Sequence, residues 1–384
     1  MLIIGFLLIL GISLSKVFLP IMARSLDPTG ILVGFVTSAW FFARTFIELP
    51  SGIISLKVGR GNLISIGLAL AFIGSLICAF SSSIYILILG MALWGFGSAL
   101  FFTSNTSLLL DLFKPERRGR AMGTFQSIEF IGSFLGAPLG GLLAAYMGFN
   151  HVFLVITALL VSSFAIAILS KEFRRIDDTV IEDFSPPTFR EALAGMGNLS
   201  LIIVCFINFS RMFVSQGVMS TVFQLYLNEH LNINVELIGI IMGVRTGGLI
   251  CALFLSGYLS DKFGRKPLII IGLLINALAI YAYSLASLLQ EFILLGILDG
   301  VGSGLIFVSL VVFMAELVHP SIRAGAVGLY RTFMDIGGVL GPVIFMFMYD
   351  MHTQSPFWAA SILLLLNLAL ALSIKSRVES DKGL

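Results

Sequence analysis

The sequence has little charge and little cysteine. Only 11% of its 384 residues are charged, whereas 58% are hydrophobic. Soluble domains carry about 25% charged residues, so this chain cannot offer water enough polar surface and its solvent is expected to be lipid. Its three cysteines, Cys78, Cys205 and Cys251, all lie within apolar runs at spacings that fit no metal motif. They are expected to be small packing residues rather than a disulfide framework or a metal site.

Signatures of catalysis or of nucleotide hydrolysis are also missing. No phosphate-binding GxxxxGK[ST] loop occurs, so we do not expect ATP-driven pumping by this chain alone. The four histidines fall in or near loops, which argues against a histidine proton relay in the core. No cluster of histidines with acids, and no nucleophile beside a base, is visible in the apolar runs. We therefore expect no enzyme, no cofactor, no metal and no nucleic-acid partner, while the formal net charge of +2 says little about partners.

Long apolar runs recur along the whole chain. A run of about 20 such residues crosses a bilayer core of ~30 Å as a helix, and these runs lack the alternation of a membrane β-barrel. The pattern predicts an all-α membrane protein with twelve transmembrane helices. We expect an N-terminal six-helix bundle over residues 1–170, a cytoplasmic linker over 171–196 and a C-terminal six-helix bundle over 197–384. The first run lacks a charged n-region, so we expect a retained helix rather than a signal peptide.

The two halves carry the same motifs at one constant offset. Ser256 to Gly272, SGYLSDKFGRKPLIIIG, matches Ser51 to Gly67, SGIISLKVGRGNLISIG, at an offset of 205 residues (257 − 52). The same offset relates two further blocks. Such internal repetition predicts two pseudo-symmetric halves. The matched pairs include Gly52 and Gly257, Gly59 and Gly264, Arg60 and Arg265, Asp111 and Glu316, Gly132 and Gly337, and Gly136 and Gly341.

The repeated loop resembles the signature loop of the major facilitator superfamily of secondary transporters. Gly257-x-x-x-Asp261-Lys-x-Gly264-Arg265-Lys266 carries that resemblance, and the glycine row around Gly132 is similar to a fifth-helix motif associated in the family with antiporters. The resemblance implies two bundles that rock around a central site to give alternating access. One departure weakens a drug–proton antiport interpretation: Met91 stands where proton-coupled drug exporters of the family usually have an arginine.

The loop residues suggest a cytoplasmic latch, by which we mean ion pairs that hold the cytoplasmic helix ends together while the outer side is open. Because the family fold brings the helix ends together, Arg60 is expected near Asp111 and Arg265 near Glu316. Asp261 has no acidic counterpart in the first half, so we expect unequal latching. The alternative is that the basic loop residues only set topology. The full set of expected gating residues is Gly52, Gly59, Arg60, Asp111, Gly257, Asp261, Gly264, Arg265 and Glu316.

Small residues at a spacing of four form a smooth face on one predicted helix. Gly132, Gly136 and Gly140 make this row, and Gly337 and Gly341 repeat it in the second half. Small residues let helices approach closely in lipid. We favour an interface with the opposite bundle over packing within the same bundle.

Ionisable groups inside the apolar runs are the candidate substrate and proton residues, since a charge at membrane depth costs several kcal/mol and usually faces a cavity. Two pairs lie four residues apart and can neutralise each other, Arg44 with Glu48 and Arg331 with Asp335. Arg211 and Arg245 have no local acid, so each needs a partner from another helix or a bound anion. Lys16 is a further basic residue at this depth, and the candidates are Arg44, Glu48, Glu129, Arg211, Arg245, Asp299, Arg331 and Asp335.

Buried acids and amides add two further hypotheses. Glu129 is a lone carboxylate that could carry a proton or pair with a distant arginine. Asp299 could bind substrate or only support packing. Asn105, Asn208 and Gln126 could hydrogen-bond a substrate.

The two repeated halves with ionisable residues inside them favour a monomeric secondary transporter of a small organic solute. We expect a proton gradient to drive it and the solute to be exported. The alternatives are uptake of an organic anion by symport or uniport, which Arg211 and Arg245 favour, and a non-transporting receptor. Basic residues concentrate in one set of loops, which predicts both termini in the cytoplasm and a location in a prokaryotic plasma membrane.

Overall fold

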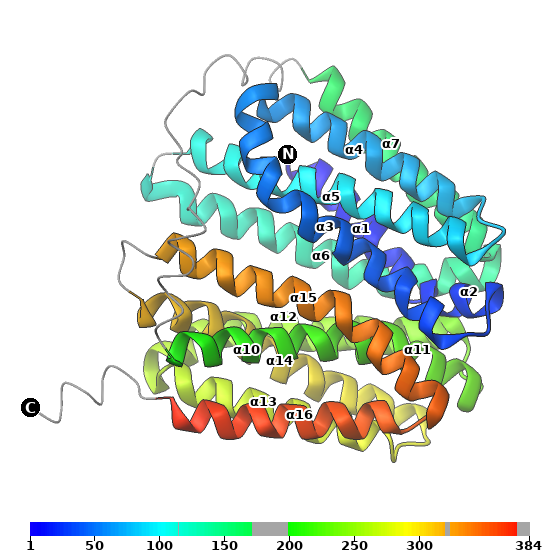
Figure 1. The fold of residues 1–384 in the computed structure, drawn as a ribbon, viewed down its shortest axis with the longest axis vertical. Coiled ribbons are helices and arrows are strands. Elements are labelled where there is room, and N and C mark those ends of the chain that lie inside the picture. The colour runs from blue at the N-terminus through cyan, green and yellow to red at the C-terminus, as the bar shows by residue number, and fades with distance from the viewer. Residues whose placement is uncertain (114, 171–198, 319–322, 375–384) are drawn as a thin grey trace, which may run out of the picture. The chain divides into compact units, whose positions relative to one another are not determined.

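The computed structural model describes residues 1–113, 115–170, 199–318 and 323–374, and all regular secondary structure in these ranges is helical (Figure 1). Within them, eleven helices are long and apolar enough to cross a membrane, and a bent N-terminal pair makes a twelfth if it counts as one span. Helices suit lipid because each one satisfies its own backbone hydrogen bonds. The predicted all-α membrane fold is confirmed, while the predicted linker lies outside the described residues.

Contacts divide the chain into two compact units, which are described separately. The first takes in residues 1–186 and 223–243, and the second takes in residues 187–222 and 244–384. The division into bundles at 1–170 and 197–384 stays a prediction.

The first unit contains long helices that pack mostly against helices other than their immediate neighbours in the chain. Its elements are α1 (Leu2–Lys16), α2 (Leu19–Leu26), α3 (Gly30–Val58), α4 (Arg60–Ala79), α5 (Ile84–Leu112), α6 (Pro115–Met147), α7 (Phe149–Leu169), α11 (Phe223–Leu225), η3 (Tyr226–His230) and the start of α12 (Val235–Phe263). The helices α1 and α2 are the bent pair, with 49° between them. Pro20 lies in the first turn of α2, where a backbone N–H has no partner within the helix, so the missing N–H of proline costs no hydrogen bond.

The second unit begins with an irregular helix. Its elements are α10 (Leu199–Val214), the π-helical segment η2 (Ser215–Val222), the rest of α12, α13 (Arg265–Tyr283), α14 (Leu289–Leu317), α15 (Arg323–Met351) and α16 (Ser355–Ser373). A π-helical turn widens the backbone and is often found at functional sites. Here it directly follows α10, the helix that carries Arg211.

The turns between paired helices need glycine. Gly59 joins α3 to α4 with φ of 88°, and Gly264 joins α12 to α13 with φ of 87°. Only glycine adopts this left-handed region without strain. The repeated loops therefore form the tight turns that their glycines predict.

The glycine row of α6 packs within its own unit. A Cβ on Gly132 would lie 3.2 Å from the carbonyl oxygen of Phe6, and one on Gly136 would lie 3.2 Å from that of Leu10. Gly140 faces Leu14 of the same helix, α1. The expected interface between this row and the opposite bundle is therefore wrong, because the backbone of α1 already fills the smooth face.

The matching row of α15 behaves in the same way. A Cβ on Gly337 would lie 3.0 Å from the backbone nitrogen of Phe213, and one on Gly341 would lie 3.0 Å from its carbonyl carbon. Phe213 belongs to α10, in the same unit. Both rows thus hold the first helix of a repeat against the fifth.

Candidate functional site

Glycines of α14 bring three helices of the second unit close together. A Cβ on Gly300 would collide with the carbonyl oxygen of Arg245 in α12, and one on Gly304 would lie 2.6 Å from the carbonyl oxygen of Leu249. Gly302 faces the other way, where a Cβ would lie 2.9 Å from the carbonyl oxygen of Gly272 in α13. Alternate glycines therefore seat α14 against α12 on one side and α13 on the other.

This close crossing produces a buried ion pair. The Nε of Arg245 donates to Oδ2 of Asp299, which is the residue before Gly300. The side chain of Asp299 is 1% exposed and that of Arg245 is 12% exposed, so neither charge is hydrated well. Of the two partners expected for Arg245, an acid from another helix or a bound anion, the structure supplies the acid.

Arg211 has a different environment. Its Nε and Nη2 donate to Oδ1 of Asn208, at 3.3 and 3.0 Å, and its guanidinium lies 5.3 Å from the ring centre of Phe307. Asn208 is held in turn, because its Nδ2 donates to the carbonyl oxygen of Tyr330 at 3.0 Å. Among the described side chains, no carboxylate forms an ion pair with Arg211. Asn208 therefore orients the guanidinium of Arg211, but no described carboxylate neutralises its charge.

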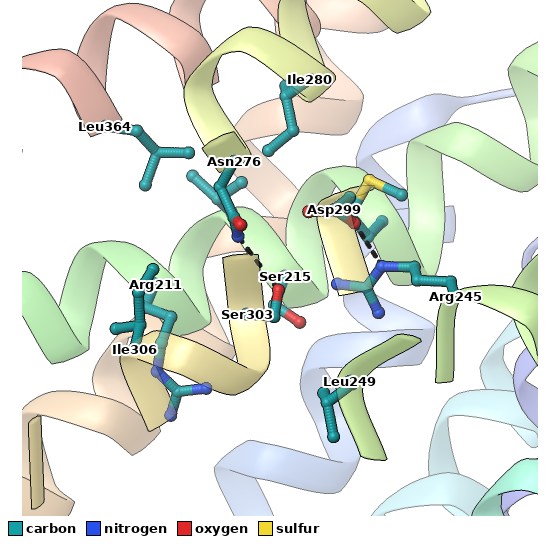
Figure 2. Close-up of a pocket in the computed structure, with 12 residues that line it drawn as sticks. Arg211, Ser215, Arg245, Leu249, Asn276, Ile280, Asp299, Ser303, Ile306 and Leu364 are labelled. Carbon is teal, nitrogen blue, oxygen red and sulfur yellow. Dashed lines mark hydrogen bonds and ion pairs between the residues drawn. The ribbon is translucent and has the colours of Figure 1, made fainter. Parts of the chain in front are cut away.

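These charged groups line one pocket of the second unit (Figure 2). Arg211, Arg245 and Asp299 share its wall with the polar side chains of Ser215 and Ser303. The pocket is partly open to its surroundings. The rest of the wall is Asn276 together with six apolar residues, Val214, Met219, Leu249, Ile280, Ile306 and Leu364.

Three polar residues of this pocket were not among the sequence candidates. Nδ2 of Asn276 donates to Oγ of Ser303 at 3.0 Å, and Ser215 lies near them in Figure 2. A signal for Asn276 existed, since it is the only amide in the predicted span 267–288. Nothing in the sequence distinguishes Ser303 or Ser215 from the other serines in apolar runs.

A second group of charges lies in the first unit. The guanidinium of Arg44 in α3 lies 5.6 Å from the ring centre of Trp40, and it is close enough to Glu129 of α6 for the two charges to interact. Oε1 of Glu129 is buried with no hydrogen-bond partner among the described residues. Of the two roles considered for Glu129, the proximity of Arg44 fits the partner of a distant arginine, and a proton role stays a prediction. The side chain of Glu48 lies outside the described ones.

The remaining candidates are spread out. Asp335 of α15 is 2% exposed, whereas Arg331 on the same helix is exposed. Lys16 is exposed in the last turn of α1. Asn105 of α5 is fully buried, and neither its Oδ1 nor its Nδ2 has a hydrogen-bond partner among the described residues.

Of the two expected loop contacts, the one between Arg265 and Glu316 can be seen, and the one between Arg60 and Asp111 lies outside the described side chains. Nε of Arg265 lies 3.3 Å from Oε1 of Glu316, as predicted. In the first unit, Nη1 of Arg60 donates to the carbonyl oxygen of Ser107 at 3.2 Å. The side chains of Asp111 and Asp261, together with Gly52, lie outside the described ones, and Gly257 is exposed with nothing within 4 Å of a Cβ placed on it.

Comparison with known families explains the repeated helices and loops. The model of the Major Facilitator Superfamily matches residues 1–213 and 203–383, which together span nearly the whole chain. The chain belongs to the major facilitator superfamily. It is therefore a multi-pass integral membrane protein of a transporter family that moves small molecules, and not an enzyme.

Curated relatives of this superfamily member include two bacterial resistance proteins. This chain is 25% identical over 368 residues to the quinolone resistance protein NorA of Staphylococcus aureus, and the match covers 92% of this chain and 90% of the relative. It is 22% identical over 376 residues to multidrug resistance protein 1 of Bacillus subtilis, covering 97% and 94%. Both matches extend over almost the full length of each protein.

Solved structures of two transporters share the fold. A bacterial homolog of the human lysosomal transporter Spinster, in an inward-facing and unoccupied conformation, gives a TM-score of 0.80 at 16% identity, covering 96% of this chain and 94% of that one. The nucleoside transporter NupG gives a TM-score of 0.74 at 17% identity, covering 97% and 96%. At such identities the likeness concerns the fold alone.

Proposed function

We propose that this protein is a secondary active exporter that moves small organic solutes out of a bacterial cell in exchange for protons. The observation that carries the proposal is the pocket of the second unit, where Arg211, Arg245 and Asp299 meet within helices that are otherwise long and apolar. Charges at such depth are costly and usually mark a substrate or ion pathway. A polar pocket with an apolar wall fits an organic solute better than a simple ion.

The direction of transport is proposed from the relatives. Both curated relatives are named for resistance to drugs, and resistance is the expected result of export. Met91 differs from the arginine usual in proton-coupled drug exporters, so the coupling residue has to be sought elsewhere. Glu129 is our candidate for the coupling residue. A buried carboxylate beside Arg44 can either bind a proton or stay ionised and be attracted to the guanidinium.

Orientation and conformational change complete the proposal. Both termini and the basic loops face the cytoplasm, following the excess of lysine and arginine on that side. The two repeats rock about a central site, and the pair Arg265 and Glu316 latches the cytoplasmic side when the outer side is open. The protein acts as a monomer in the plasma membrane.

Uptake of an organic anion is the second candidate. Arg211 favours it, since its charge is not neutralised by a described carboxylate and could attract an anion from outside. The direction of coupling distinguishes the two candidates. Antiport requires protons and solute to cross in opposite directions, and symport requires the same direction.

Purified protein in proteoliposomes tests the proposal. We expect a quinolone to accumulate in vesicles with an acidic interior, because protons leaving the vesicle drive the solute inward. A protonophore should abolish the accumulation, and vesicles without protein set the background. Accumulation that needs an acidic exterior would indicate symport and overturn the exporter proposal, as would transport that ignores the gradient.

A carboxylate variant tests the coupling residue. Glu129→Gln should remove gradient-driven accumulation but retain exchange of labelled for unlabelled quinolone, because exchange needs no net proton movement. Asp350→Asn is the matched control, since Asp350 is exposed at the end of α15. Loss of exchange as well would contradict a role confined to the proton, and unchanged accumulation would exclude Glu129 as its carrier.

A further inference from the structure

We propose that the pocket of the second unit recognises a single carboxylate on its substrate, and that Arg211 is the residue that binds it. The substrate class is then an amphipathic organic monoanion, or a zwitterion with one carboxylate. This inference deepens the proposed transport function and rests on it only in assuming that the pocket binds solute.

The first step is the contrast between the two arginines of the pocket. Arg245 is neutralised by Asp299, and the close crossing at Gly300 holds the two helices together. Arg211 lies against the neutral oxygen of Asn208, the face of Phe307 and the neutral hydroxyl of Tyr330, and none of these carries a compensating charge. The described charges of the pocket are therefore two positive and one negative, which leaves one positive charge for a ligand.

The second step is the cost of that charge without a ligand. A guanidinium removed from water loses its hydration, and neutral contacts restore only part of it. Arg211 also lies close enough to Arg245 for the two like charges to repel each other. A bound carboxylate would relieve both effects, and the planar guanidinium suits it because two N–H groups can donate to its two oxygens.

The third step is that Arg211 is already positioned for binding. Asn208 accepts from Nε and Nη2, and it is fixed to the backbone of α15 through Tyr330. The orientation of the guanidinium is thus set by a neutral group rather than by an acid that would compete with the ligand. A group held in place before binding loses less conformational entropy when the ligand arrives.

The rest of the wall indicates what the carboxylate is attached to. Six of the twelve lining residues are aliphatic or methionine side chains, which suit an apolar body. The amide of Asn276 and the hydroxyls of Ser303 and Ser215 offer a few neutral hydrogen bonds. Two carboxylates would exceed the one free charge, so a dianion is expected to bind worse than a monoanion.

Binding to the purified full-length protein in detergent tests the inference without any proton gradient. The probes are a quinolone carboxylic acid, its methyl ester, and an aromatic dicarboxylate of similar size, each measured by equilibrium dialysis. We expect the acid to bind at least about 10-fold more tightly than the ester, the size of effect typical of a charge-assisted hydrogen bond. The dicarboxylate should bind more weakly than the acid.

Variants assign the preference to one residue. Arg211→Gln should weaken binding of the acid by about 10- to 100-fold and leave the ester nearly unchanged, so that the preference disappears. Arg211→Lys should restore part of it, because the charge returns without the planar fork. Arg120→Gln is the matched control, since Arg120 is exposed in α6 of the first unit.

A double variant separates Arg211 from its neighbour and guards against misfolding. Arg245→Gln with Asp299→Asn removes the ion pair without leaving a lone charge, and it should weaken acid and ester alike while the preference remains. The inference is overturned if wild-type protein binds acid and ester equally, if it binds no carboxylate probe, or if the preference follows Arg245 instead of Arg211. Failure of proton-driven export would leave these binding results in place, so the two proposals fail independently.

Discussion

The same helix crossing occurs in both units with different side chains. At the offset of 205, Arg245 corresponds to Trp40 (245 − 205), and Asp299 corresponds to Trp94 (299 − 205). Gly300 corresponds to Gly95, and a Cβ on either glycine would collide with the carbonyl oxygen of its partner, Arg245 or Trp40. The backbone geometry of the crossing is thus shared, while the side chains at these two positions are tryptophans in one unit and an ion pair in the other.

The difference separates what the fold needs from what the site needs. In the first unit the ring of Trp40 packs against Phe41 and that of Trp94 against Phe153, and the Nε1 of each indole is buried without a hydrogen-bond partner among the described residues. Packing therefore does not require charge at this position. Replacing a buried ion pair by apolar groups is often neutral or stabilising. The pair Arg245 and Asp299 is better explained by the pocket that it lines than by stability.

The largest expected effect comes from breaking the ion pair on one side. Asp299→Asn leaves the charge of Arg245 buried and unpaired, which should cost about 3–5 kcal/mol of stability. The double variant with Arg245→Gln should recover most of that loss, because no lone charge remains. Thermal unfolding in detergent, followed by tryptophan fluorescence, measures both. Equal losses of stability in the single and double variants would show that packing does need the ion pair. That result would contradict the conclusion drawn from the two crossings.

An intermediate effect is expected at the shared glycines. Gly95→Ala and Gly300→Ala each force a methyl group against a backbone carbonyl, and overpacking of this kind costs about 1–3 kcal/mol. Similar losses of stability in the two variants would support one common crossing. Gly123→Ala is the control, because a Cβ there has nothing within 4 Å and alanine favours a helix. A tolerated alanine at either crossing would show that the two crossings are not equivalent.

Much of this architecture could be predicted from the sequence. Apolar runs fix the length and the type of the helices, since lipid leaves the backbone few choices. A constant offset reveals the repeat without knowledge of any contact. Gly59 and Gly264 follow from the turn that joins two antiparallel helices, and their positive φ angles agree. The pair Arg265 and Glu316 was expected from the family's loop, and the contact is present.

Contacts between helices were harder to predict. A glycine row such as Gly132 and Gly136 shows which face of a helix is smooth, but not which neighbour covers it, and here α1 does. Asp299 pairs with Arg245 across 54 residues, a partner visible only once the crossing at Gly300 is known. Asn276 joins the pocket for the same reason. Periodicity is a property of one helix, whereas a site is a property of several.

The smallest expected effect concerns the cytoplasmic loops. Arg265 meets Glu316 there, and Arg60 donates to the carbonyl oxygen of Ser107, while the side chain of Asp111 lies outside the described ones. The side chain of Glu316 is 52% exposed, so the pair should contribute no more than about 1 kcal/mol, and less at high salt. A double-mutant cycle of Arg265→Gln and Glu316→Gln, read by thermal unfolding at low and high salt, measures this coupling.

Transport then shows whether the small coupling acts as a latch. If the pair stabilises the state with a closed cytoplasmic side, Arg265→Gln should change the rate of quinolone exchange, and the swap Arg265→Glu with Glu316→Arg should restore the rate. Arg117→Gln, another exposed basic residue, controls for loss of loop charge. If Arg265→Gln and Arg117→Gln alter the rate equally, the loop charges act only on topology and the latch is excluded. A restored rate in the swap would instead mean that the attraction itself sets the balance between the two states, since the swap keeps the pair and reverses only its polarity.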